Sequence, residues 1–99
     1  MPNKISVLLV DDHTLVRLGF RRLLEDAPDV RVVGEAKDGE EAIRLAQELR
    51  PRVIVMDCAL PGVSGLVATR KILEKLPETG VLMLSMRIDN DFLCCGILF

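Results

Sequence analysis

Acidic side chains follow two apolar runs of the chain, and their type and position could support chemistry. The run at residues 7–10 ends on Asp11 and Asp12, within the stretch VLLVDDH, and the run at residues 53–56 ends on Asp57. Two carboxylates a few ångströms apart repel by roughly 4 kcal/mol at an effective dielectric of about 20, so a fold would normally keep them apart. Three carboxylates with no matching Lys or Arg nearby in sequence favour a hard divalent cation, and Mg²⁺ takes oxygen ligands of this kind. The sequence therefore predicts a Mg²⁺ site, where a bound cation could also draw a phosphoryl donor to an aspartate.

The positions of these acids depend on strands that alternate with amphipathic helices. Short, largely apolar runs predict strands at residues 5–10, 30–36, 53–56 and 81–84. Apolar residues at helical spacing predict helices that include residues 16–27, 42–49 and 66–76, and Ser64 is a candidate N-cap for the third of them. This alternation with short connections predicts an α/β fold, a doubly wound parallel sheet with right-handed crossovers and helices on both faces.

The expected sheet places the acids at a common edge. In an open parallel sheet, ligands bind beyond the carboxyl ends of the strands, at the point where the strand order reverses. If the first strand lies between the second and the third, that point falls between the first and third strands, which end at Asp11, Asp12 and Asp57. Arg31 and Glu35 interrupt the second strand, and charged positions of this kind suit a sheet edge.

Composition excludes several classes of protein. The 99 residues suit one small domain, and the formal net charge of −2, without a block of Lys and Arg, argues against a nucleic-acid footprint. No apolar run is long enough to span a bilayer, and the N-terminal residues MPNKISV carry no apolar signal segment. The three cysteines lack a CxxC spacing, which argues against a zinc site or a disulfide framework. A reducing, cytoplasmic location fits this pattern best.

Four stretches together resemble the receiver domains of two-component response regulators: VLLVDDH, GEAKDGEEAI, VIVMDCALPGVSG and VLMLS. The segment DDHTLVRLGFRRLL is similar to the NarL/FixJ-type subclass. The resemblance covers about residues 5–86 and implies a flavodoxin-like fold. It also implies a cytoplasmic role in two-component signal transduction and transcription regulation, with a sensor histidine kinase as partner.

The resemblance also implies roles for individual residues. Asp57 would be the phosphoacceptor, and Asp12 would ligate Mg²⁺ directly while Asp11 helps through water. The backbone carbonyl of Ala59 would complete the protein ligands of the metal, and Ser85 would supply the hydroxyl that binds the phosphoryl group in the active state.

The C-terminal residues 87–99 depart from the family pattern. The lysine of the family's fifth strand, its aromatic switch residue and its fifth helix have no counterpart, and no DNA-binding output domain is encoded, so we expect no DNA binding by this chain. A truncated product and a degenerate receiver that acts only as a protein-interaction module are the alternatives to a working phosphoacceptor. A phosphatase or phosphotransferase would commonly carry a second acid two residues after its nucleophile. Ala59 occupies that position, so we expect no enzyme beyond self-catalysed phosphoryl transfer to Asp57.

Three further expectations concern packing and assembly. Residues 81–84 have the composition of an interior strand, and without a fifth strand one edge would be unpaired except where the apolar tail, residues 92–99, covers it. This predicts a homodimer or domain-swapped oligomer, and the alternative is a marginally stable, aggregation-prone monomer. His13 could be a metal ligand, but at a strand-to-helix junction a helix-start residue is the more common role. Cys58 is interpreted as a packed thiol rather than a redox-active one.

Overall fold

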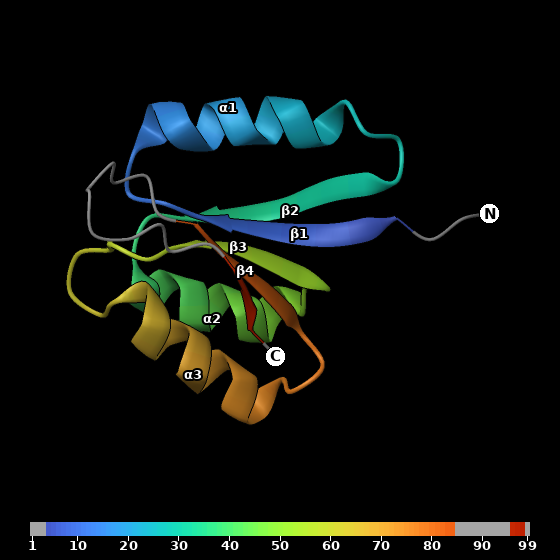
Figure 1. Ribbon diagram of the computed structural model, residues 1–99. Coiled ribbons are helices and arrows are strands. Elements are labelled where there is room, and N and C mark those ends of the chain that lie inside the picture. Colours follow the sequence, from blue (N-terminus) through green and yellow to red (C-terminus); the bar gives the residue numbers. More distant parts are fainter. Residues whose placement is uncertain (1–3, 85–95, 99) are drawn as a thin grey trace.

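A single sheet forms the centre of the computed structural model, which describes residues 4–84 and 96–98 (Figure 1). Its strands are β1 (Ile5–Val10), β2 (Val30–Ala36), β3 (Val53–Asp57), β4 (Gly80–Leu84) and β5 (Gly96–Leu98). They lie in the order β2-β1-β3-β4-β5, and the first four are parallel. The expected position of β1 between β2 and β3 and the expected edge position of β2 are both confirmed.

The fifth strand differs from expectation. We expected the family's fifth strand to be missing and the apolar tail, residues 92–99, to cover at most part of the β4 edge. In the structure β5, which lies in that tail, pairs with β4 in the antiparallel direction, with Val81 opposite Leu98 and Met83 opposite Gly96. This part of the edge is therefore paired, by a strand that runs opposite to the other four. An antiparallel partner needs no crossover helix, and its backbone groups can satisfy those of β4 whatever side chains it carries.

Three helices pack against this sheet. They are α1 (Thr14–Glu25), α2 (Gly39–Leu49) and α3 (Gly65–Lys75). Asp38 caps α2 by accepting a hydrogen bond from the Glu41 backbone N–H, and Ser64 caps α3 in the same way from Val67. The N-cap predicted at Ser64 is confirmed, and so is the doubly wound, flavodoxin-like arrangement of four parallel strands and three helices. Among the described residues no helix has the length and apolar character that a membrane span requires.

The helices cover the two faces of the sheet unequally. In Figure 1 α2 and α3 lie together below the sheet, and α1 is the one described helix above it. The larger core lies on the α2 and α3 side, where Leu8, Ile54, Met56 and Ile72 are fully buried. The core under α1 is built around Val7, Leu9 and Val32, and no residue of α1 itself is fully buried.

Candidate functional site

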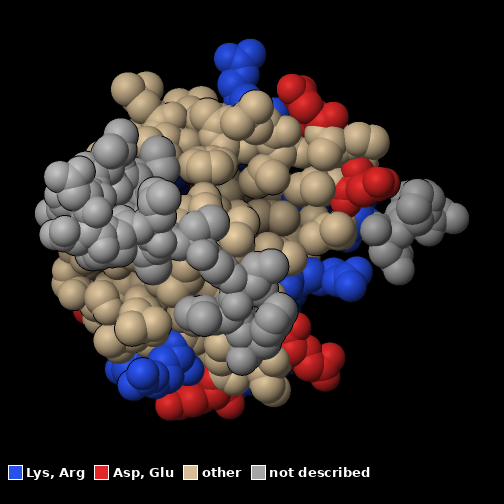
Figure 2. All heavy atoms as spheres, viewed as in Figure 1, with Lys and Arg blue, Asp and Glu red and all other residues tan. Residues whose placement is uncertain are grey.

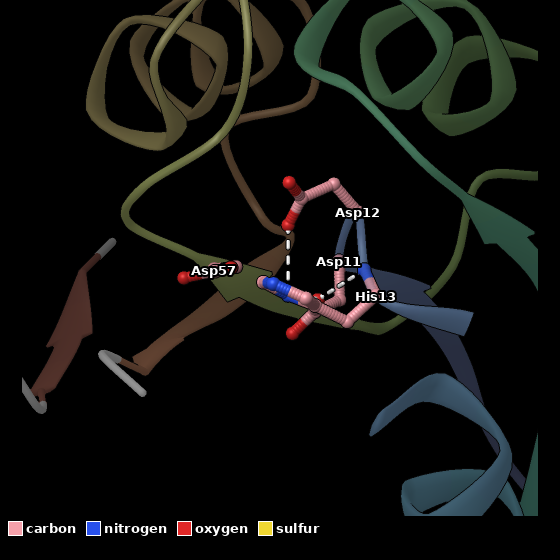
Figure 3. Close-up of side chains that lie close together, drawn as sticks. All are labelled: Asp11, Asp12, His13 and Asp57. Carbon is pink, nitrogen blue, oxygen red and sulfur yellow. Dashed lines mark hydrogen bonds and ion pairs between the residues drawn. The ribbon is translucent and has the colours of Figure 1, made fainter. Parts of the chain in front are cut away.

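The carboxyl ends of β1 and β3 bring four chemically active side chains together (Figure 3). Asp11 and Asp12 follow β1, His13 precedes the first turn of α1, and Asp57 is the last residue of β3. One ligand atom from each of the four residues lies within 4.8 Å of the others. The apolar strands hold the acids in place because their ends are fixed by the buried core. The structure therefore places the three acids of the sequence analysis in one cluster, with His13 added.

Asp57 is the most deeply buried member of the cluster, ahead of Asp11. Its residue is only 4% exposed, and its Oδ1 accepts a hydrogen bond of 3.1 Å from the Ala59 backbone N–H. Burial raises the pKa of Asp57 above its ordinary value, and the nearby charges of Asp11 and Asp12 raise it further. A buried carboxylate that shares its surroundings with two other acids is stabilised in its charged form by a cation.

His13 lies beside Asp11 and Asp12 and carries positive charge there when its imidazole is protonated. Its Nδ1 lies 3.0 Å from an oxygen of Asp11 and 3.0 Å from an oxygen of Asp12. Its backbone N–H also donates to Asp11 at 2.8 Å. The hydrogen bond to Asp11, followed by the charge of Asp12, raises the pKa of His13. His13 is the N-cap of α1, as a helix-start reading requires, but its side chain makes no capping hydrogen bond and faces the acids instead.

The loop after Asp57 is fixed by backbone contacts. The Cys58 N–H donates to the Leu84 carbonyl at 3.0 Å, which ties the loop to the end of β4. The Gly65 N–H donates back to the Cys58 carbonyl at 3.2 Å, and a side chain at Gly65 would collide with the carbonyl oxygen of Asp57. Gly62 adopts a φ of 70°, in the left-handed region that glycine tolerates best. The glycines of the LPGVSG stretch thus allow α3 to begin directly against the backbone of Asp57.

Arg17 is a site residue that the sequence analysis did not identify. Its guanidinium donates to the Asp11 backbone carbonyl at 2.5 Å and to Glu35 at 3.1 Å. It also lines a small hollow beside Asp11, Asp57 and Phe20. The helical pattern predicts that Arg17 lies on the polar face of α1, but it does not show whether the guanidinium contacts solvent or another residue. Only its position six residues after Asp11 could have indicated the contact with that residue.

The two other predicted site residues, Ala59 and Ser85, are not members of the side-chain cluster. Ala59 lies beside Asp57 through the backbone hydrogen bond already described. Ser85, the residue directly after β4, lies outside the described residues. The space-filling view in Figure 2 shows acidic and basic side chains interspersed around one face, with uncharged residues between them.

Comparison with protein families gives a match over most of the chain. The family described as "Response regulator receiver domain" matches residues 7–95. The transcriptional regulatory protein LiaR of Bacillus subtilis (strain 168) is 47% identical over 87 residues, which are 88% of this chain and 41% of that protein. The response regulator UvrY of Escherichia coli (strain K12) is 46% identical over 86 residues, 87% of this chain and 39% of that protein. The chain thus spans about two fifths of the length of these relatives.

Solved structures give the same fold. The response regulator domain of Thermotoga maritima CheB superposes with a TM-score of 0.83 at 40% identity, covering 90% of this chain and 66% of that one. The signal receiver domain of the putative response regulator NarL from Mycobacterium tuberculosis superposes with a TM-score of 0.83 at 35% identity, covering 90% of this chain and 72% of that one.

Proposed function

The chain belongs to the response regulator receiver domain family, and from this premise we propose that residues 1–99 act as a phosphoacceptor domain that takes a phosphoryl group on Asp57 in the presence of Mg²⁺. The observation that carries this proposal is the cluster of three aspartates at the ends of β1 and β3, with ligand atoms within 4.8 Å. In the family, the donor is a sensor histidine kinase, and we propose such a kinase as the partner of this chain.

The donor set suits Mg²⁺. Carboxylate oxygens are its preferred protein ligands, and the buried Asp57 gains a counter-charge when a cation binds. We propose that Asp12 ligates directly, that Asp11 acts through water and that the Ala59 carbonyl completes the protein ligands. When bound, the ion neutralises charge on the phosphoryl oxygens.

The chain's own groups orient the acceptor. The Ala59 N–H holds Oδ1 of Asp57, so we assign nucleophilic attack to Oδ2. A P–O bond to Asp57 forms as the P–N bond of the kinase phosphohistidine breaks, and the released histidine nitrogen takes a proton. Ser85 is proposed to bind the transferred phosphoryl group through its hydroxyl. No turnover of a separate substrate follows from this chemistry, because the phosphoryl group stays on the protein.

A second candidate function rests on which of the three aspartates have an ion-pair partner. Within the part of the chain that the structure describes, the ion pairs of Asp11 and Asp12 are both with His13, and Asp57 has no ion pair. This observation favours a degenerate receiver that binds a kinase or receiver partner without efficient phosphorylation.

The remaining parts of the proposal concern assembly and output. The homodimer or domain-swapped oligomer stays a prediction, and so does the cytoplasmic location. LiaR is named as a transcriptional regulatory protein, and another structural relative, RcsB, has been solved in complex with DNA. For this chain we propose participation in transcription regulation without DNA contact of its own, because its charges are mixed and its net charge is −2.

Phosphorylation by acetyl phosphate tests the proposal. With Mg²⁺ present, we expect the intact mass to rise by one phosphoryl group, and we expect the rise to vanish in Asp57→Asn and without Mg²⁺. Asp11→Asn is the matched control, since it removes a neighbouring carboxylate and keeps the acceptor, so it should lower the yield without abolishing it.

Two results would contradict this assignment or favour the second candidate. A mass increase that persists in Asp57→Asn would place the acceptor elsewhere. A wild-type chain that binds Mg²⁺ and stays unmodified would favour the interaction module.

A further inference from the structure

We propose that His13 completes the aspartate cluster as a nitrogen ligand, so that the site binds late first-row transition-metal cations (Ni²⁺, Cu²⁺ and Zn²⁺) more tightly than Mg²⁺. The inference rests on the proposed function only in using the same cation site. It adds a ligand, and a class of metal, that an all-oxygen magnesium site does not contain.

The positions of the ligand atoms carry the first step. Nδ1 of His13 lies 3.0 Å from an oxygen of Asp11 and 3.0 Å from an oxygen of Asp12. Two neighbouring ligands of an octahedral ion with bonds of about 2.1 Å are separated by about 3.0 Å, so both pairs already have the spacing of adjacent ligands. Asp57 also places a ligand atom within 4.8 Å of each of the others (Figure 3).

The backbone explains why the imidazole stays at this position. The His13 N–H donates to Asp11 at 2.8 Å, which fixes the Cα of His13 beside the acids. As N-cap of α1 the residue could use its side chain to accept from the first turn, but it makes no such bond. The side chain is 61% exposed, so neither burial nor capping accounts for its direction toward Asp11 and Asp12.

Asp57 is the second observation that points to a bound cation. Its residue is 4% exposed, yet no ion pair is found for it among the described residues. His13 forms ion pairs with Asp11 and Asp12, whereas the carboxylate of Asp57 has a single described hydrogen bond, from the Ala59 N–H. An ion held between His13 and Asp57 would place further positive charge directly beside the carboxylate of Asp57.

Ligand chemistry selects the metal. Imidazole suits zinc, copper and nickel, whereas carboxylate and water suit magnesium, and affinity at a given site rises along the first row toward Cu²⁺. The imidazole must be neutral to bind a metal ion, so a protonated His13 would release one proton to solvent when the ion binds. Three carboxylates and one imidazole around a divalent ion leave a single net negative charge, which solvent at this open edge can stabilise.

Copper spectroscopy tests the ligand directly, because His13 is the single histidine of the chain. In tag-free protein loaded with Cu²⁺, we expect nitrogen hyperfine coupling in the electron paramagnetic resonance spectrum. Labelling histidine alone with ¹⁵N should change that coupling. His13→Asn, which keeps a good N-cap residue, should abolish it. Cys58→Ser is the matched control for thiol binding and should leave it unchanged.

Calorimetry measures the selectivity. Wild type should bind Ni²⁺ at least about tenfold more tightly than Mg²⁺, following the affinity order for nitrogen-containing sites. His13→Asn should lower the Ni²⁺ affinity by about 10–100-fold, at least as much as removing an outer-shell group costs. It should change the Mg²⁺ affinity far less, because the oxygen ligands remain.

Three outcomes would overturn the inference. These are Cu²⁺ coupling that is insensitive to the histidine label, equal losses of Ni²⁺ and Mg²⁺ affinity in His13→Asn, and an unchanged Ni²⁺ affinity in that variant. Normal phosphorylation of Asp57 together with any of these would remove the inference and keep the proposed function. If Cu²⁺ shows coupling to the histidine label but acetyl phosphate leaves the chain unmodified, the inference stands and the proposed function is contradicted.

Discussion

The two faces of the sheet are built from similar residues and are protected very differently. On β3, Ile54 and Met56 point toward α2 and α3 and are completely buried, while Val53 and Val55 point toward α1 and are only partly buried. The same alternation occurs on β4, where Val81 and Met83 are buried and the residues between and after them are not. Helices α2 and α3 each contribute buried residues, and α1 contributes none.

The contrast teaches that burial follows helix cover and not strand composition. An apolar strand can carry two apolar faces and still have one of them half exposed, because α1, the one helix described on that face, spans only part of the sheet. We therefore expect the α2 and α3 face to provide most of the stability of the fold. The following predictions test that division.

The largest expected effect is the loss of a fully buried side chain on the α3 side. Ile72 has no exposed surface, so Ile72→Ala should lower the free energy of unfolding by about 2–5 kcal/mol. Leu24→Ala, on the partly buried side of α1, should cost only about 1 kcal/mol, since that side chain already contacts solvent. Urea unfolding followed by far-ultraviolet circular dichroism measures both.

Equal losses from these two variants would contradict the comparison, because they would show that α1 is packed as tightly as α3. If Ile72→Ala does not fold, Ile72→Val gives a milder version of the same test, with an expected cost of about 0.5–1.5 kcal/mol.

A pair of glycines gives the next effect in size. A Cβ at Gly65 would collide with the Asp57 carbonyl, so Gly65→Ala should lower stability by about 1–3 kcal/mol and shift the amide resonances of Asp57 and Cys58. Gly19 in α1 has nothing within 4 Å of an added Cβ, so Gly19→Ala should raise stability by about 0.5–1 kcal/mol through the helix preference of alanine. If both substitutions stabilise the protein, the close approach of α3 to β3 is wrong.

The smallest expected effect concerns Asp57, at the carboxyl end of β3, where both faces of the sheet meet the acidic cluster. The pKa of Asp57 is raised above its ordinary value of 3.8 by burial first and by Asp11 and Asp12 next, so its charged form opposes folding. The stabilising contribution of the protonated group is complete below the unfolded pKa and is lost as the pH rises through the higher folded pKa.

Asp57→Asn should therefore unfold at a higher temperature than wild type at neutral pH in the presence of a chelator. The expected rise in Tm is about 4 °C, equivalent to roughly 1 kcal/mol for a chain of this length. The difference should shrink as the pH falls toward 4, which thermal melts across a pH series can follow. A constant difference at every pH would show that the carboxyl charge is not its cause.

The sequence predicted the frame of the molecule because that frame depends on local patterns. Apolar runs ending on acids marked β1 and β3, and Ser64 before a helical stripe marked the start of α3. The topological rule for parallel sheets then placed Asp11, Asp12 and Asp57 at one edge. These inferences need only periodicity, capping preferences and chain connectivity.

The remaining features depend on contacts between distant parts of the chain. Whether the C-terminal segment pairs with β4, and in which direction, is decided by backbone hydrogen bonds that no side-chain pattern encodes. The direction of the His13 imidazole depends on the carboxylates of Asp11 and Asp12, while Arg17 depends on Glu35 of β2. Neither arrangement leaves a periodic signal.

The strand order also has a consequence for the time course of folding. Val7 of β1 pairs with Val32 of β2 and with Val53 of β3, so the first strand to be synthesised must wait for two later segments. Each parallel pairing closes a loop that includes a whole helix, and the entropy of that closure slows folding. We expect β1, α1 and β2 to emerge from the ribosome as a unit that leaves one side of β1 unpaired until β3 is made. During that interval the apolar side chains of β1 are exposed, and we expect chaperones to bind the nascent chain there.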